Sequence, residues 1–272
     1  MKELLSEIIA VIVIYQKPID DSKAYQALKP LITQGLSVLI FDNSTADQAA
    51  PPELIYHHSH HNEGVSGAYN FAAQKAIQSG KTWLWLLDDD TLVDPDFVKE
   101  VSTHLQAGTS AGLYVPRILS KGKLLSPFRI HQSLSKRMES IKTGLHPIEY
   151  IRPINSGMLI QTDLFQQAGG YSTSLPLDFS DIEFTDRLKD IQETMYVTKA
   201  FFEQNFSGDE RPPLAKAKQR FAMYARSASV YAKTVAHPYH LRKQVLKRAL
   251  RLSLQYFSPY FMAVFLKTSF TE

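Results

Sequence analysis

Residues 83–91 read Trp-Leu-Trp-Leu-Leu-Asp-Asp-Asp-Thr, an apolar run that ends in three carboxylates. Five consecutive large apolar side chains predict a strand that is buried on both faces. Burying three adjacent acids would be very costly, so we expect Asp88, Asp89 and Asp90 to emerge at the carboxyl end of this strand. In open α/β folds, ligands bind at that edge of the sheet.

The residues upstream alternate between strand and helix patterns. Apolar or extended runs lie at 8–15, 36–41, 54–57 and 82–87, and helical patterns lie between them at 20–34 and 66–78. This alternation predicts a parallel sheet with crossover helices. We therefore expect an α/β fold in which residues 1–92 form one regularly wound half.

The pattern after residue 92 is mixed. It predicts helices at 95–105, 163–168 and 180–190, the last with Ser180 as its N-cap, and strands at 112–116 and 157–161. The polar stretch from 120 to about 144 has no clear periodicity. We expect residues 93–210 to complete a mixed sheet within one domain, 1–210, which ends near Arg211-Pro212-Pro213.

The C-terminal region, 211–272, differs in charge from the rest of the chain. Residues 211–271 contain 12 Lys or Arg and no acid, whereas 1–210 holds 18 basic and 26 acidic residues. Two helices are expected, 214–235 and 240–256, and the second places Leu241, Val245, Ala249 and Leu252 on one face with basic residues opposite. Such helices either contact an anionic membrane, pack on the acidic body or mediate a homodimer.

Composition limits the chemistry and the compartment. The chain has no cysteine, which excludes disulfides, thiolate metal sites and a cysteine nucleophile and is typical of a reducing compartment. The first apolar run is shorter than a membrane span or a complete signal peptide, and Glu3 and Glu7 precede it. We expect a cytoplasmic protein that can attach peripherally to the inner face of the cell membrane.

The spacing of Asp88 and Asp90 suggests a metal site. Mg²⁺ and Mn²⁺ prefer carboxylate oxygens together with substrate phosphates, and two Asp residues separated by one residue can face the same ion. The alternative is an acidic loop that precedes a helix.

Polar turns after the second and third runs suggest contacts to a ligand. Asp42-Asn43-Ser44 and Asn62-Glu63-Gly64 follow these runs, and Asn70 lies further into the helical pattern. Short polar side chains and glycine at such positions can bind a nucleobase and a ribose. Each motif taken alone can equally be a plain turn or a helix cap.

A second acidic cluster begins the helix expected at 180–190. Asp181 and Glu183 lie in its first turn, where the helix dipole favours an ionised carboxylate that can accept a proton. The alternative is a capping arrangement with a Glu183–Arg187 pair.

Taken in order, six motifs resemble family-2 glycosyltransferases, in particular the bacterial rhamnosyltransferase and galactofuranosyltransferase group. The resemblance covers about residues 8–230. The motifs are Val13-Ile14-Tyr15, Asp42-Asn43-Ser44, Asn62-Glu63-Gly64, Leu87-Asp88-Asp89-Asp90, Asn155-Ser156-Gly157 and Asp178-Phe179-Ser180-Asp181-Ile182-Glu183.

The resemblance implies a GT-A fold, with a Rossmann-like nucleotide-binding half, an acceptor-binding half and C-terminal helices. The implied donor is a dTDP- or UDP-linked sugar, rhamnose or another hexose, and the implied acceptor is a glycan or a lipid-linked saccharide; no nucleic acid partner is expected. Asp181 would be the base of an inverting reaction, Glu183 would support it, and Asp88 and Asp90 would hold Mn²⁺ or Mg²⁺. The donor would contact Tyr15, Asp42, Asn43, Asn62, Gly64, Asn70, Asp88 and Asp89, and the acceptor Ser156, Gly157 and Asp178.

One departure from the family pattern leaves other interpretations open. The family usually has a histidine after the last strand of the catalytic body, where this chain has Gln204-Asn205-Phe206-Ser207. An inactive GT-A-like module that binds a membrane or a protein through its basic helices is therefore an alternative.

A phosphohydrolase with an aspartate nucleophile is less favoured, because Asp88 follows the fourth strand and no glycine precedes Thr91. The histidines at 57–61 are expected in a solvated loop rather than at a metal.

Overall fold

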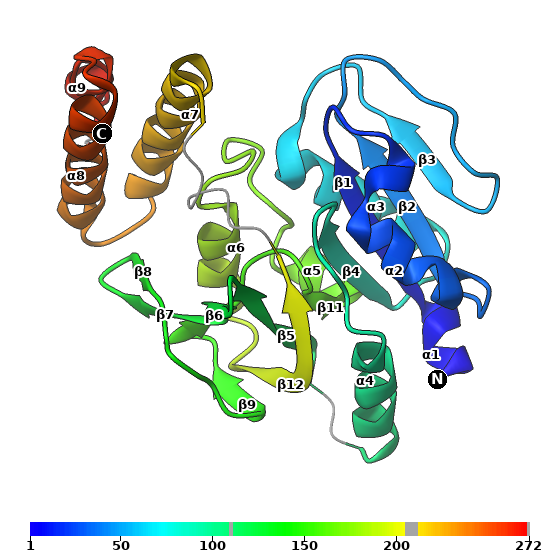
Figure 1. Ribbon diagram of the computed structural model, residues 1–272. Helices are drawn as coiled ribbons and strands as arrows, with labels where there is room; N and C mark the ends of the chain where they lie inside the picture. Colours follow the sequence, from blue (N-terminus) through cyan, green and yellow to red (C-terminus); the bar gives the residue numbers. More distant parts are fainter. Residues whose placement is uncertain (109–110, 205–211, 271–272) are drawn as a thin grey trace.

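A nine-stranded mixed sheet forms the centre of the molecule in the computed structural model, which describes residues 1–108, 111–204 and 212–270 (Figure 1). Its strand order is β3-β2-β1-β4-β11-β5-β12-β9, and β6 pairs with β5. A smaller sheet has the order β10-β7-β8.

The first half has the predicted parallel winding. Its strands pair in parallel: β1 (Ile8–Ile14), β2 (Ser37–Asp42), β3 (Ile55–His58) and β4 (Trp83–Asp88). The crossover helices are α2 (Lys23–Ile32) and α3 (Gly64–Gln78). The short helix α1 (Lys2–Glu7) and a 3-10 turn at Ile19–Asp21 are additions that the apolar periodicity did not indicate.

Strand β4 is buried on both faces, as the opening sequence predicts. Leu84 and Leu86 pack in a core with α3, whereas Trp85 and Leu87 pack on the opposite face with α2 and α4 (Asp96–Gln106). The strand can therefore accommodate no charge until it passes the edge of these two cores, and Asp88 is its last residue.

The second half is mixed because one antiparallel strand separates parallel ones. Strand β11 runs antiparallel to β4 and β5, while β12 runs parallel to β5. The strands are β5 (Leu113–Ser120), β6 (Lys123–Ser126), β7 (Phe128–His131), β8 (Leu134–Lys136), β9 (Gly144–Pro147), β10 (Ile151–Arg152), β11 (Leu159–Gln161) and β12 (Thr194–Glu203), and the helices are α5 (Thr162–Gln167) and α6 (Ser180–Leu188).

Strands in the stretch 120–144 were not predicted. Strands β6, β7 and β8 each have three or four residues and form short antiparallel pairs. Such short strands, several with exposed residues, carry too few apolar positions to establish a periodicity of two.

The prediction that Ser180 caps a helix is wrong. Phe179 is the residue before α6, with a left-handed φ of 67°, and Ser180 is the first helical residue. The Ser180 hydroxyl donates to the Leu177 carbonyl at 2.8 Å and accepts from the Asn155 amide at 3.1 Å. Contacts with the neighbouring loops, rather than a local cap, therefore fix the start of this helix.

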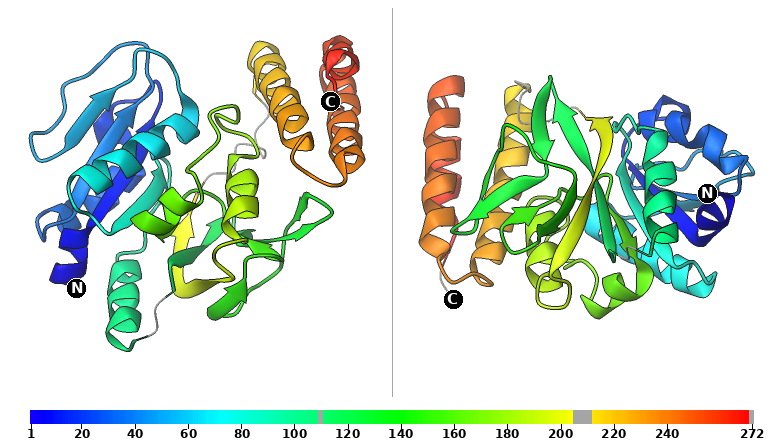
Figure 2. Two further views of the ribbon diagram at one scale, coloured as in Figure 1. Left: turned by 180° about the vertical axis from the view of Figure 1, so that it is seen from behind. Right: turned by 90° about the horizontal axis from the view of Figure 1, so that it is seen from below.

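Three C-terminal helices form a layer at one end of the molecule (Figures 1 and 2). They are α7 (Leu214–Ala232), α8 (Pro238–Tyr256) and α9 (Tyr260–Lys267), of which α9 was not predicted. As expected for the second helix, the side chains at 241, 245 and 249 are buried and that at 252 packs partly against them. In the described residues, no helix is long and apolar enough to cross a membrane.

Helix α7 packs directly on the second half of the sheet domain. One hydrophobic cluster joins Leu175 and Ile182 to Phe221 and Tyr231 of α7. The Asp186 carboxylate of α6 also accepts hydrogen bonds from Arg152 at 2.9 Å and from the Tyr231 hydroxyl at 2.6 Å. The predicted domain end at residue 210 and Arg211 both lie outside the described residues, and the boundary remains a prediction.

The contact between Tyr231 and Asp186 can be tested by stability. Burial and Asp186 raise the pKa of the Tyr231 hydroxyl, so it stays protonated and donates a hydrogen bond to that carboxylate at every relevant pH. A Tyr231→Phe variant should lower the free energy of unfolding by about 1–3 kcal/mol, because a charged acceptor loses a buried donor. The exposed Tyr239→Phe change should stay within about 0.5 kcal/mol in the same urea titration. Equal stability of the two variants would contradict this contact.

Candidate active site

Strand register brings three predicted site segments to one edge of the sheet. Ile14 at the end of β1 pairs with Asp42 at the end of β2, and Val13 pairs with Asp88 at the end of β4. Tyr15, which follows β1, is exposed beside them. The carboxyl edge of the parallel strands therefore collects Tyr15, Asp42 and the acidic triplet, as the sequence predicts.

The carboxylates of the triplet have different partners. Asp88 accepts hydrogen bonds from the Tyr69 hydroxyl at 3.1 Å and from the Gln204 amide nitrogen at 2.6 Å. Asp89 forms an ion pair with Lys17, and its backbone carbonyl accepts from the Ser22 hydroxyl.

The ionised forms of Asp88 and Asp90 are destabilised by their surroundings. Burial and then the charge of Asp90 raise the pKa of Asp88 to about 6. Burial and then the charge of Asp89 raise the pKa of Asp90. A bound cation would relieve both effects, because it stabilises the ionised forms.

Ser156 and Gly157 lie under the triplet. The Ser156 hydroxyl accepts from the backbone N–H of Asp88 at 3.1 Å and shares a 2.6 Å hydrogen bond with the Thr91 hydroxyl, and Ser156 is only 2% exposed. Gly157 has a φ of +86°, and a Cβ there would lie 2.6 Å from the Pro116 ring. The Ser156 contacts position the triplet, and the acceptor role of Ser156 and Gly157 stays a prediction.

Asp42 lies in a closed hydrogen-bond network. Its carboxylate accepts from the Ser44 backbone N–H at 2.8 Å, and from the Gln48 amide and the Tyr56 hydroxyl at 2.9 Å each. Burial acts to raise its pKa, but these hydrogen bonds outweigh it and lower the pKa of Asp42. The ionised side chain therefore shapes the loop after β2.

Asn43 joins that loop to the loop before α3. Its side-chain oxygen accepts from the Glu63 N–H at 2.9 Å, and its side-chain nitrogen donates to the Gly64 carbonyl at 3.2 Å. The exposed Asn62 accepts from the Gly64 N–H at 2.9 Å. The two loops are thus held as one unit.

The start of α3 touches the loop before α6 in the second half. Gly64 has a φ of +67°, and a Cβ there would lie 2.1 Å from the Pro176 carbonyl oxygen, which accepts from the Val65 N–H at 2.8 Å. Asn70 exchanges hydrogen bonds of 2.7 and 2.8 Å with the backbone of Tyr171. Both polar atoms of the Asn70 side chain therefore hold the loop that leads to α6, which is a different contact from the predicted donor contact.

Asp181 stands at the start of α6 with a raised pKa. Burial is the main cause, the charges of Asp178 and Asp88 add to it, and backbone N–H groups at 181 and 182 partly offset it, so that the pKa of Asp181 is about 6. A carboxylate with this pKa is suited to accept a proton near neutral pH.

Glu183 forms the predicted pair with Arg187. The guanidinium makes two hydrogen bonds of 2.7 and 2.8 Å to the carboxylate and also donates to the carbonyls of Ala168 and Gly170. Glu183 therefore anchors α6 to the turn after α5. Asp178 is paired with Arg220 of α7 at 3.2 Å, so a C-terminal helix reaches the predicted acceptor site.

Sequence reasoning missed several of these partners. Tyr69 lies on the apolar face of α3 and is fully buried, but its hydroxyl reaches Asp88. The only indication that Lys17 could contact the site was its position just after β1. The local sequence around Arg220 gave no such indication. Contacts between elements far apart in the chain recruit all three.

The prediction of a solvated loop is wrong for His57 and His58, because both lie in β3 and are only partly exposed. His57 stacks on Phe71 with ring centres 4.0 Å apart, and His58 is hydrogen-bonded to the Ser44 carbonyl at 2.9 Å. Within the residues described, no three His, Cys, Asp or Glu side chains are grouped so that they could hold a metal ion.

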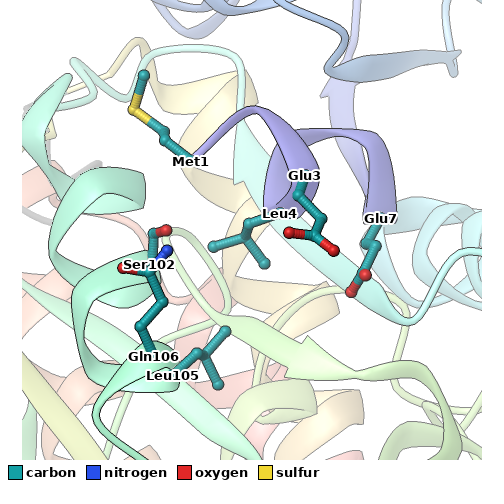
Figure 3. A pocket seen from close by; sticks show the side chains of 7 residues that line it. All are labelled: Met1, Glu3, Leu4, Glu7, Ser102, Leu105 and Gln106. Carbon is teal, nitrogen blue, oxygen red and sulfur yellow. The ribbon is translucent and has the colours of Figure 1, made fainter.

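A surface pocket between α1 and α4 lies near the amino end of β1, away from the acidic triplet (Figure 3). It combines apolar and polar side chains without a pair of facing catalytic groups, and is lined by Met1, Glu3, Leu4, Glu7, Ser102, Leu105 and Gln106. The candidate site is instead the carboxyl edge described above.

Solved structures with similar folds are GT-A glycosyltransferases. S. aureus TarS matches with a TM-score of 0.53 and 14% identity over 86% of this chain, which spans 41% of that protein. TarS 1-349 in complex with UDP-GlcNAc matches with a TM-score of 0.54 and 13% identity, covering 94% of this chain and 79% of that one. The Pyrobaculum calidifontis mannosyltransferase PcManGT in complex with GDP-Man and Mn²⁺ matches with a TM-score of 0.51 and 14% identity, covering 95% and 73%. The chain has the GT-A fold.

A family match agrees with this fold. The family model described as "Glycosyl transferase family 2" matches residues 34–167, which extend from just before β2 to the end of α5 and include the acidic triplet. No curated protein sequence matches the chain.

The support under the triplet can be tested by removing one hydroxyl. A Ser156→Ala variant leaves the Asp88 N–H and the Thr91 hydroxyl without their buried partner, so the free energy of unfolding should fall by about 1–3 kcal/mol. The exposed Ser135→Ala change on β8 is the matched control and should have almost no effect. If denaturant titrations gave equal values for both variants, Ser156 would not have this role.

Proposed function

We propose that the protein is an inverting glycosyltransferase that transfers rhamnose or another hexose from a nucleotide-diphosphate sugar to a hydroxyl of a glycan or lipid-linked saccharide. The observation that carries the proposal is the approach of two acidic clusters from different halves of the fold. The Tyr69 hydroxyl donates to Asp88, and its ring centre lies 5.3 Å from that of Tyr171. The Tyr171 hydroxyl donates to Asn155, whose amide donates to Ser180 at the start of α6.

A divalent cation fits the residues present at the triplet. The side-chain oxygen of Gln204 is buried and has no hydrogen-bond partner in the described structure, while the amide nitrogen of the same residue faces Asp88. Asp88, Asp90 and the Gln204 oxygen would supply the hard oxygen ligands that Mg²⁺ or Mn²⁺ prefers. The ion would neutralise charge on the departing diphosphate. Because the site has only two carboxylates, its affinity for the metal ion should depend on the bound nucleotide.

The donor side combines exposed groups with preformed loops. Tyr15 and Asn62 are exposed at the ends of β1 and of the loop before α3, where they are free to contact a nucleoside. Asp42 and Asn43 would act by fixing the backbone of the two loops around the nucleoside. The complexes of TarS with UDP-GlcNAc and of PcManGT with GDP-Man and Mn²⁺ support a nucleotide-sugar donor, and we favour a dTDP- or UDP-linked one.

On the acceptor side, Asp181 would act as the general base. It takes the proton of the acceptor hydroxyl as that oxygen bonds to the anomeric carbon, while the bond from that carbon to the diphosphate oxygen breaks. The Glu183–Arg187 pair would orient the first turn of α6. We place the reaction in cell-surface polysaccharide synthesis at the cytoplasmic side of the membrane.

One contact favours a second candidate, a weakly active or inactive module that binds a membrane or a protein. The Gln204 nitrogen donates to an Asp88 oxygen at 2.6 Å, and this contact competes with a metal ion for that oxygen. Absence of any nucleotide-sugar binding would favour this candidate.

Two substitutions separate the base from the donor site. Asp181→Asn should lower transfer by about 10²–10⁴-fold but leave Mn²⁺-dependent nucleotide binding intact, because only proton acceptance is lost. Asp90→Ala should lose transfer and binding together. The exposed Asp163→Asn change on α5 is the matched control. The assignment fails if Asp181→Asn transfers sugar at the wild-type rate in an assay that follows release of the nucleoside diphosphate.

The pH profile should report the base. A base with a pKa of about 6 is ionised above that value, so kcat/KM should be level above about pH 6 and fall about tenfold per pH unit below it. Saturating Mn²⁺ keeps Asp88 ionised, so the titration of Asp88 does not contribute to the profile. Residual activity of Asp181→Asn should lack this inflection. An unchanged inflection in that variant would assign the titration to another group.

A further inference from the structure

The outer side of α8 and the turn into α9 expose large apolar side chains. Leu254 is 74% exposed, Phe257 94% and Leu266 76%, and Leu250 is exposed as well. Lys243, Lys247, Leu250 and Leu254 follow one another at spacings of three or four residues, which places them along one side of the helix. We call this surface the α8–α9 face; it comprises Lys243, Lys247, Leu250, Arg251, Leu254 and, at the turn into α9, Phe257.

The most exposed side chain is fixed at a corner. Phe257 follows α8 in a left-handed conformation with a φ of 50°, which is unfavourable for an aromatic residue. The Ser258 N–H donates to the Ser253 carbonyl at 3.1 Å and closes the helix end. The turn therefore holds the Phe257 ring out into solvent.

The same face carries positive charge that nothing nearby offsets. Lys243, Lys247 and Arg251 are exposed, and in the described part of the chain none of them forms a salt bridge. No Asp or Glu occurs in residues 211–271. The face thus combines protruding apolar groups with cations.

The face points away from the catalytic body. Helix α7 lies between α6 and the pair α8–α9, and the buried side of α8 is turned toward α7 and α9 (Figures 1 and 2). Contact through the outer side would leave the edge with the acidic triplet open.

We propose that the α8–α9 face docks on an anionic lipid surface, with Phe257 and Leu254 in the headgroup region and the three cations against lipid phosphates. A helix with apolar and basic residues on its outer side binds in this way. A symmetric contact between two copies would set each cation against like charges, which disfavours a second copy as the occupant. Nucleic acid would leave the protruding apolar side chains without a partner.

Docking in this orientation has a consequence that rests on the proposed function. Arg220 of α7 pairs with Asp178 beside the proposed base, so the docked helices adjoin the acceptor side of the site. Docking would therefore keep the acceptor side within reach of the membrane that holds a lipid-linked acceptor. The test below needs no transferase activity, so docking and catalysis can fail separately.

The test is co-sedimentation of the full chain with vesicles of phosphatidylcholine alone or mixed with phosphatidylglycerol. Wild type should bind the mixed vesicles, and more weakly at high salt. Lys243→Glu with Lys247→Glu should weaken binding more than about fivefold per charge, and Leu254→Ser with Phe257→Ser at least about tenfold. Lys99→Glu on α4 and Ile77→Ser on α3, both exposed positions of the body, are the matched controls and should bind like wild type.

A second measurement reports insertion. Trp83 and Trp85 are buried, so emission from a Phe257→Trp variant should shift to the blue when mixed vesicles are added, over an unchanged background. Equal binding to neutral and mixed vesicles, or no binding, would overturn the proposal. So would a dimer of the free protein that Leu254→Ser with Phe257→Ser abolishes, because the face would then bind a second copy.

Discussion

The cost of burying charge decides where the site lies. Strand β4 passes between two hydrophobic cores, one on each face, and its side chains from Trp83 to Leu87 are buried. A carboxylate cannot replace any of them, so the three acids must follow the strand where the cores end. Because β1 and β2 run parallel to β4, their polar ends reach the same edge. The burial of one strand thereby sets the position of the whole proposed donor side.

A second constraint is the coupling of the two halves through backbone contacts. The start of α3 is fixed against Pro176, and Asn70 holds the backbone of Tyr171, so the donor half shapes the loop that carries Asp181. The site therefore depends on these contacts as well as on its charged side chains. A larger side chain at Gly64 would displace that loop and therefore move the proposed base relative to the acidic triplet.

The strongly patterned parts of the fold were predictable, and the contacts of the site were only partly so. Continuous apolar runs predicted β1, β2 and β4, because burial on both faces leaves a clear signal, whereas β3 was predicted only as a short extended run. The short strands between 120 and 144 leave almost none. For the site, acidic residues at strand and helix ends could be chosen from the sequence, but Ser156 and Asn70 take contacts from segments far away in the chain. Local sequence does not encode such partners.

The central claim is that the acidic edge binds a nucleotide-diphosphate sugar with a divalent ion. A thermal-shift comparison of UDP-, dTDP- and GDP-linked sugars, each with and without Mn²⁺, tests it most directly. The account predicts that a UDP- or dTDP-linked sugar raises the melting temperature of the protein and that Mn²⁺ enlarges the rise. Contradiction would be the same melting temperature with every nucleotide sugar, whether or not Mn²⁺ is present.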